Sequence, residues 1–107
     1  MNHFKKTTHL SEIIEKSDSG PVIIFIDSSD CNASTAIYQN LKSATKNKTI
    51  ALPVYLVIVQ EMPVLSRKIE EFFGIKHESP QILILNRGKV VYTAHHNDIK
   101  PKNFAFQ

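Results

Sequence analysis

The chain of 107 residues contains one cysteine, three glycines, five prolines and no tryptophan. A single cysteine excludes an internal disulfide and is typical of a compartment in which thiols stay reduced. So little glycine and proline excludes a fibrous repeat and argues against a disordered chain. The first residues form no apolar stretch of the kind that directs secretion or crosses a membrane. We therefore expect a cytoplasmic protein with no membrane partner.

The residues that are present indicate one globular domain over residues 1–107. Hydrophobic residues make up 42% of the chain, and its length is a common one for a domain. The formal charge of +3 arises from 13 basic and 10 acidic residues. Lys42, Lys46 and Lys48 lie close together without aromatic residues between them, which is typical of a solvated helix face. We therefore expect no nucleic-acid partner.

Hydrophobic periodicity predicts elements in the order α, β, α, β, α, β, β, α. The expected elements are helices over residues 7–17, after Cys31 and over 64–74, strands over 22–26 and 53–60, a hairpin turning at Asn86-Arg87-Gly88, and a last short helix capped by Asp98. The two β-α-β alternations predict parallel strands, and the hairpin adds an antiparallel edge. The predicted fold is therefore α/β, with a four-stranded mixed sheet flanked by helices.

The segment "DSSDCNAS", residues 27–34, places Cys31 where a predicted strand is followed by a predicted helix. Backbone N–H groups in the first turn of a helix stabilise a thiolate and lower a cysteine pKa from about 8.5 to roughly 3.5–7.5. Ser34 lies one turn further on, where its hydroxyl can donate a hydrogen bond to the sulfur. The C-x-x-S spacing provides no second thiol, so a mixed disulfide on Cys31 has to be cleared by an outside thiol.

A purely structural interpretation of this segment remains open. A lone cysteine is often a small buried hydrophobic residue, and Ser34 is also consistent with an ordinary position early in a helix. The polar neighbours of Cys31 favour a surface position at the carboxyl end of a strand, where α/β folds bind ligands.

Ser79-Pro80 stands directly before the third predicted strand. A trans proline that opens an edge strand is one interpretation. The other is a cis proline, because the start of this strand is expected beside the Cys31 junction and a cis bond there would expose the backbone of Ser79 to an extended substrate.

Five histidines raise the question of a metal site, above all the pair His95-His96. Adjacent residues on a strand point to opposite faces of the sheet, which makes this pair a poor chelator. The chain also lacks the C-x-x-C and H-x-x-x-H spacings of zinc sites. We therefore expect no metal and no bound cofactor.

The C-x-x-S motif, "VQE" at residues 59–61, "LS" at 65–66 and "GIKHESPQILIL" at 74–85 together resemble the monothiol bacilliredoxin family of the thioredoxin superfamily. The resemblance covers nearly the whole chain and implies a thioredoxin-like fold. It also implies a thiol-disulfide oxidoreductase that removes bacillithiol, its co-substrate, from mixed disulfides on proteins. The implied partners are bacillithiolated client proteins and bacillithiol or a reductase as the resolving reductant.

The same resemblance assigns roles to individual residues. Cys31 would attack the bacillithiol sulfur, and Ser34 matches the serine of the motif. Pro80 matches the family's cis-proline, with Ser79 as the main-chain docking residue. His96 falls where the family often has histidine, and we assign it no role.

Two residues beside the cysteine depart from the family pattern, which usually reads Thr-Cys-Pro-Ile-Ser. Asp30 precedes the thiol, and its carboxylate opposes the helix end by raising the cysteine pKa. Asn32 replaces a proline that suits the first helical position. We place Asp30 and Asn32 with the substrate-binding residues. The chain also reads Pro63-Val64-Leu65-Ser66 where the family tends to have Arg-Pro-Leu-Ser, so a cation is missing there.

Two other functions remain open from the sequence. A non-catalytic thioredoxin-fold module would bind a partner protein in the groove between Cys31 and Pro80, and this binding would survive Cys31→Ala. A peroxide-reducing thiol would require Cys31 to form sulfenic acid faster than it exchanges disulfides.

Overall fold

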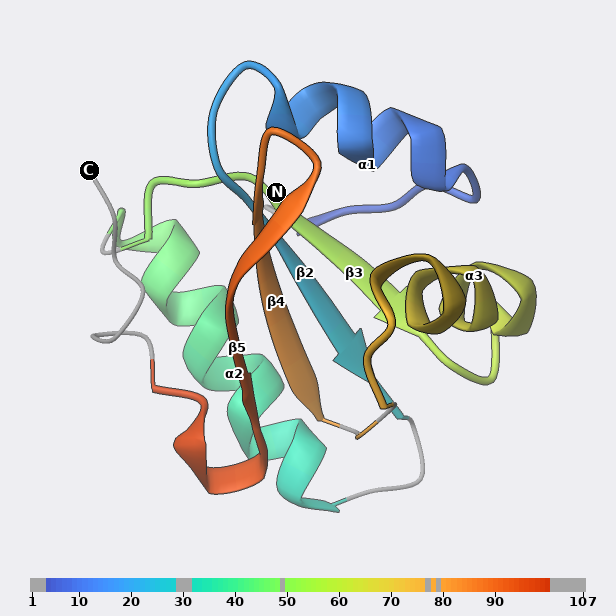
Figure 1. The fold of residues 1–107 in the computed structure, drawn as a ribbon. Coiled ribbons are helices and arrows are strands. Elements are labelled where there is room, and N and C mark those ends of the chain that lie inside the picture. The colour runs from blue at the N-terminus through green and yellow to red at the C-terminus, as the bar shows by residue number, and fades with distance from the viewer. Residues whose placement is uncertain (1–3, 29–31, 49, 77, 79, 101–107) are drawn as a thin grey trace.

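The computed structural model describes residues 4–28, 32–48, 50–76, 78 and 80–100, with the backbone alone at 32–35 and 97. The elements are β1 (Phe4–Lys5), α1 (Leu10–Ser17), β2 (Val22–Asp27), α2 (Asn32–Lys46), β3 (Val54–Ile58), α3 (Pro63–Phe73), β4 (Gln81–Asn86), β5 (Lys89–His95) and a 3₁₀ turn, η1 (His96–Asp98) (Figure 1). The strands form one sheet in the order β1-β3-β2-β4-β5. The α/β architecture predicted from the sequence is confirmed.

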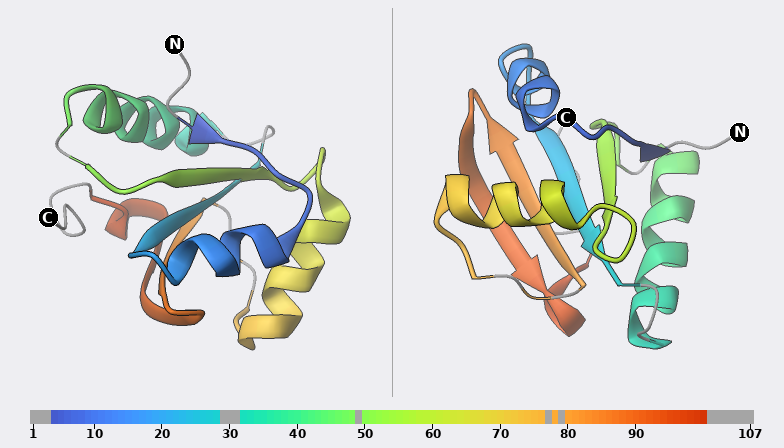
Figure 2. Two further views of the ribbon diagram at one scale, coloured as in Figure 1. Left: turned by 90° about the horizontal axis from the view of Figure 1, so that it is seen from above. Right: turned by 90° about the vertical axis from the view of Figure 1, so that its right-hand side faces the viewer.

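The sheet lies between two layers of helices (Figure 2). Strand β2 is buried along its whole length, as its continuous apolar sequence predicts. Because successive side chains alternate between faces, Ile23 and Phe25 join one core cluster, and Ile24 and Ile26 join the other.

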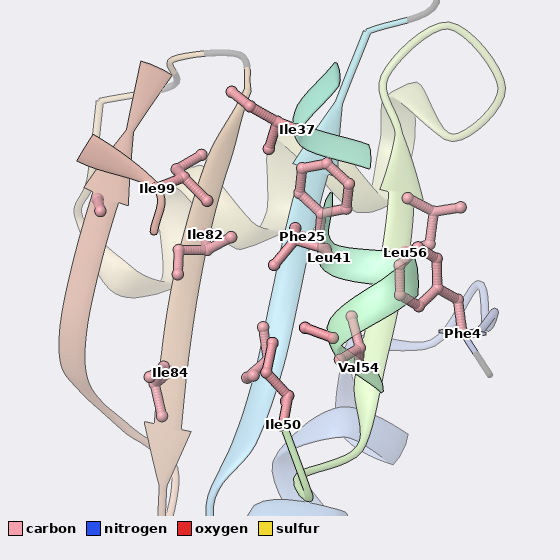
Figure 3. Close-up of a cluster of buried hydrophobic side chains, with 13 residues drawn as sticks. Phe4, Phe25, Ile37, Leu41, Ile50, Val54, Leu56, Ile82, Ile84 and Ile99 are labelled. Carbon is pink, nitrogen blue, oxygen red and sulfur yellow. The ribbon is translucent and has the colours of Figure 1, made fainter. Parts of the chain in front are cut away.

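Helix α2 covers one face of the sheet and contributes Ile37 and Leu41 to the first core cluster (Figure 3). Helices α1 and α3 cover the other face, with Ile13 and Ile69 fully buried there. On that face, burial and the nearby Glu12 raise the pKa of Tyr55 above its ordinary value of 10.0.

The sheet has a fifth strand that the sequence did not predict. Strand β1 pairs in parallel with β3, with Phe4 opposite Val54 and Lys5 opposite Tyr55. Two residues are too few to show a periodic pattern. Phe4 is nevertheless buried, and its ring meets those of Phe25 and Tyr38 edge to face, at centroid distances of 6.3 and 5.3 Å.

The predicted direction of the third long strand is wrong. Strand β3 runs parallel to β2, but β4 runs antiparallel to it, with Ile26 opposite Gln81. Strand β3 ends at Ile58, opposite Asp27, so both β2 and β3 finish at the same edge of the sheet. Helix α3 returns the chain to that edge, and β4 starts there. The order β-α-β along the chain does not by itself reveal whether the connecting helix carries the chain back to the opposite edge of the sheet, which a parallel strand would require.

Local boundaries differ from the prediction for identifiable reasons. Helix α1 starts at Leu10 instead of residue 7, because the Thr7 hydroxyl accepts a hydrogen bond from the His9 N–H and holds the preceding segment outside the helix. Asp98 lies inside the short 3₁₀ turn and does not cap it. The predicted end of α3 at Gly74 is confirmed, since Gly74 adopts the left-handed conformation that closes a helix, with φ 63°.

The predicted hairpin is confirmed, and its turn consists of Arg87 and Gly88 alone. Both residues have positive φ, 53° and 76°, as the tight turns of hairpins require. In the part of the chain that the structure describes, no helix has the length and apolar character needed to cross a membrane.

Ser17, at the end of α1, joins this helix to the hairpin turn. Its side chain is fully buried, and its hydroxyl donates to the Ile14 carbonyl at 2.6 Å and accepts from the Gly88 N–H at 2.9 Å. The Ser17 carbonyl accepts from the Arg87 N–H at 2.9 Å. One residue therefore satisfies both backbone donors of the turn.

Ser17→Ala is expected to lower the free energy of unfolding by about 1–2 kcal/mol, because the Gly88 N–H loses its acceptor in a place that water reaches poorly. Urea denaturation followed by circular dichroism measures this change. Thr45→Ala is the matched control, since the Thr45 hydroxyl makes the same type of bond, to the Lys42 carbonyl, at an exposed position. Equal losses in the two variants would contradict the proposed role of Ser17.

Candidate functional site

The candidate site lies at the edge of the sheet where β2 ends and α2 begins. Asn32, which follows Cys31 directly in the sequence, is the first residue of α2. Asp30, Cys31 and Ser79 lie outside the described residues. The structure therefore describes the elements on either side of the predicted thiol, which are the end of β2 and the start of α2.

The antiparallel pairing of β4 with β2 brings the start of β4 to this edge. Gln81, the first residue of β4, lies opposite Ile26, which precedes the last residue of β2. Pro80 stands immediately before Gln81 and is buried. The expectation that the start of this strand lies beside the Cys31 junction is thus confirmed for the described elements, while the isomer of the Ser79-Pro80 bond stays a prediction.

Asn32 and Ser34 both belong to the first turn of α2. Their side chains lie outside the described part of the chain, so the hydrogen bond predicted between the Ser34 hydroxyl and the Cys31 sulfur stays a prediction.

A buried carboxylate, which the sequence analysis did not single out, ends strand β2. Asp27 is only 7% exposed, and its Oδ1 accepts a hydrogen bond from the Ser28 N–H at 2.9 Å. The Ser28 hydroxyl in turn accepts from Gln60 Nε2 at 2.7 Å, which links the segment after β2 to the segment after β3. The signal in the sequence was an acidic residue directly after five apolar ones, where a carboxylate needs polar partners.

A second missed residue is Gln81, which is only 4% exposed. Its side-chain Oε1 accepts a hydrogen bond from the Glu78 N–H at 3.2 Å. This hydrogen bond joins Glu78, which precedes Pro80 in the chain, to the first residue of β4. A glutamine at the head of the otherwise apolar run "QILIL" was the signal for a buried polar role.

The structure also gathers Glu78, His95 and His96 at this edge. Each offers one potential ligand atom, and these atoms lie within 4.8 Å of one another. The prediction that the two histidines diverge is wrong, because β5 ends at His95 and His96 has a φ of 53°, outside the extended region. Their ring centroids lie 5.2 Å apart. The alternation argument against a metal site therefore does not hold for this pair.

Solved structures of other proteins share the fold of this chain. A protein with a thioredoxin fold, assigned as an oxidoreductase, superposes with a TM-score of 0.82 at 24% identity, covering 96% of this chain and 91% of that one. Thioredoxin from Malassezia sympodialis gives a TM-score of 0.73 at 14% identity, with coverages of 96% and 85%. Thioredoxin from Fasciola hepatica gives 0.69 at 14% identity, with coverages of 90% and 86%. The predicted thioredoxin-like fold is confirmed.

The sequence comparison is more specific. The family model described as monothiol bacilliredoxin BrxC matches residues 2–104. The match therefore includes Cys31, Ser34, Pro80 and both ends of the sheet.

Proposed function

The chain belongs to the monothiol bacilliredoxin family, and we propose that it removes bacillithiol from mixed disulfides on proteins through Cys31. Membership of this family gives the chain a thiol redox role. The proposal adds the substrate, the attacking group and the fate of the bacillithiol.

The reaction is a thiol-disulfide exchange. The Cys31 thiolate attacks the bacillithiol sulfur of the mixed disulfide, the disulfide bond to the client breaks, and the client leaves as a thiolate that takes up a proton. Bacillithiol is then attached to Cys31. A second bacillithiol molecule, or a thiol of a reductase, attacks the bacillithiol sulfur of this new disulfide, so Cys31 leaves as a thiolate and the bacillithiol stays in a disulfide with the attacking thiol. No net oxidation of the enzyme occurs over the cycle.

The observation that carries this proposal is the position of the chain's only cysteine. Cys31 directly precedes the first residue of α2, and unpaired N–H groups at such a position favour a thiolate. Because no second cysteine exists in the sequence, bacillithiol on Cys31 cannot be displaced by an internal thiol. That composition supports a monothiol cycle.

The arrangement of β2 and β4 near Cys31 suits the binding of an extended client segment. Strand β4 starts beside the end of β2, so a peptide held against the backbone of Ser79, next to Pro80, would present its modified cysteine toward the start of α2. Ser34 would stabilise the leaving and attacking sulfur of Cys31, and Asp30 and Asn32 would border the bound client.

A direct test mixes the reduced protein with a bacillithiolated client and follows both by intact mass. We expect the client to lose bacillithiol while an equal mass appears on Cys31, because the attack transfers the whole group. Cys31→Ala is expected to leave the client unchanged. If neither mass changes in the folded wild-type protein, the reaction is refuted for this client. Client binding that persists in Cys31→Ala would then favour the non-catalytic binding module.

Ser34→Cys tests the monothiol character of the site. The variant gains a thiol at the C-x-x-C spacing, so bacillithiol on Cys31 is expected to leave as the two cysteines form an internal disulfide. Intact mass should show loss of hydrogen from the variant instead of an adduct. Ser43→Cys is the matched control, because it adds an exposed thiol further along the same helix and should retain the adduct on Cys31. A stable adduct on Ser34→Cys would contradict the proposed geometry.

Asp30→Asn tests whether the neighbouring carboxylate restrains the thiol. Removing the negative charge favours the thiolate, so the variant is expected to react several-fold faster with a neutral alkylating reagent near pH 7. Stopped-flow alkylation measures the rate. Asp18→Asn, at the exposed C-cap of α1, is the control for a general change in charge. Equal rates in wild type and Asp30→Asn would show that Asp30 does not act on Cys31.

A further inference from the structure

The geometry points to a binding site for one divalent transition-metal cation, formed by Glu78, His95 and His96. One ligand atom from each residue lies within 4.8 Å of the other two. The cluster lies at the same edge of the sheet as the candidate thiol site, but none of its three residues has a role in the proposed exchange reaction.

The backbone at the end of β5 turns both imidazoles to the same region. In a continuing strand, His95 and His96 would point to opposite faces of the sheet. Strand β5 ends at His95, however, and His96 adopts a left-handed conformation that is uncommon for residues other than glycine. The two rings therefore meet edge to face, with an interplanar angle of 86°.

Hydrogen bonds hold the backbone of all three residues in place. The His96 N–H donates to the Pro80 carbonyl at 2.9 Å, and the His96 carbonyl accepts from the Ile99 N–H at 3.1 Å. His95 lies opposite Gln81 in the sheet. The Glu78 N–H donates to the Gln81 side chain at 3.2 Å. The ligands are thus brought together by the fold, which lowers the ordering cost of binding a cation.

Two imidazole nitrogens and one carboxylate oxygen are ligands that zinc accepts, as in sites with two histidines and one glutamate. Atoms bound to one zinc ion at about 2.0–2.2 Å lie about 3.3 Å apart, so the three side chains have to approach one another slightly. His95 and His96 are exposed and Glu78 is half-buried, which leaves their side chains room to rotate. Water would complete the coordination. Cobalt, nickel and copper ions suit the same ligands.

A simple ion pair does not account for the whole cluster. Glu78 Oε2 and His96 Nδ1 lie 3.9 Å apart, which is an ion pair only when the imidazole is protonated. That pair does not involve His95, whose ring meets the His96 ring edge to face. A cation would draw together all three groups, with both imidazoles neutral.

The test uses the untagged, metal-free protein in its reduced form. Calorimetric titration with Zn²⁺ is expected to show one bound ion per chain, and Co²⁺ is expected to compete for the same site. His95→Ala, His96→Ala and Glu78→Gln should each weaken Zn²⁺ binding about tenfold or more, because each removes a direct ligand. Circular dichroism verifies that each variant is folded.

Two matched variants separate this site from other ligands on the chain. His9→Ala removes an exposed imidazole before α1, and Cys31→Ser removes the only thiol. Both are expected to bind Zn²⁺ as the wild type does. Independently of any variant, Cu²⁺ should broaden the imidazole NMR signals of His95 and His96 before those of His9. Absence of stoichiometric Zn²⁺ binding, survival of binding in both His95→Ala and His96→Ala, or its loss in Cys31→Ser would overturn the proposal.

Discussion

Strand β2 lies buried between two neighbours that run in opposite directions, and the arrangement of the candidate site depends on this pairing. The parallel strand β3 ends beside the end of β2, and the antiparallel strand β4 begins there. One edge of the sheet therefore receives the start of α2, the segment around Pro80 and the end of β5. Hydrophobic burial on both faces fixes the register, since a slip of one residue would exchange the side chains that enter the two core clusters.

Much of the fold could be predicted because its main elements leave strong local patterns. The continuous apolar run of β2, the helical spacing around Ile69 and the Arg87-Gly88 turn each follow from a few neighbouring residues. Strand β1 and the direction of β4 could not be predicted in the same way. Strand β1 is defined only by its partner in β3, and the direction of β4 depends on the path of α3 across the sheet.

The candidate site shows the same division between local and non-local information. The sequence alone reveals the motif that contains Cys31 and Ser34, because the motif directly follows a predicted strand. It also reveals the position of Pro80, which directly precedes another predicted strand. Asp27 and Gln81 were missed, since their importance comes from burial and from hydrogen-bond partners. The approach of His95 to His96 was mispredicted because a single left-handed residue ends the alternation on which the sequence argument relied.

The link between α1 and the hairpin has a consequence for the order in which the chain folds. The hydrogen bond from the Gly88 N–H to the Ser17 hydroxyl joins residues 71 positions apart. Closing a loop of that size costs chain entropy before any contact repays it, so this link forms only after the central strands have shortened the intervening chain. We therefore expect α1 to dock late, as the step that completes the native layer over β2. Nascent chains that lack the hairpin would leave uncovered the part of α1 that packs against β4.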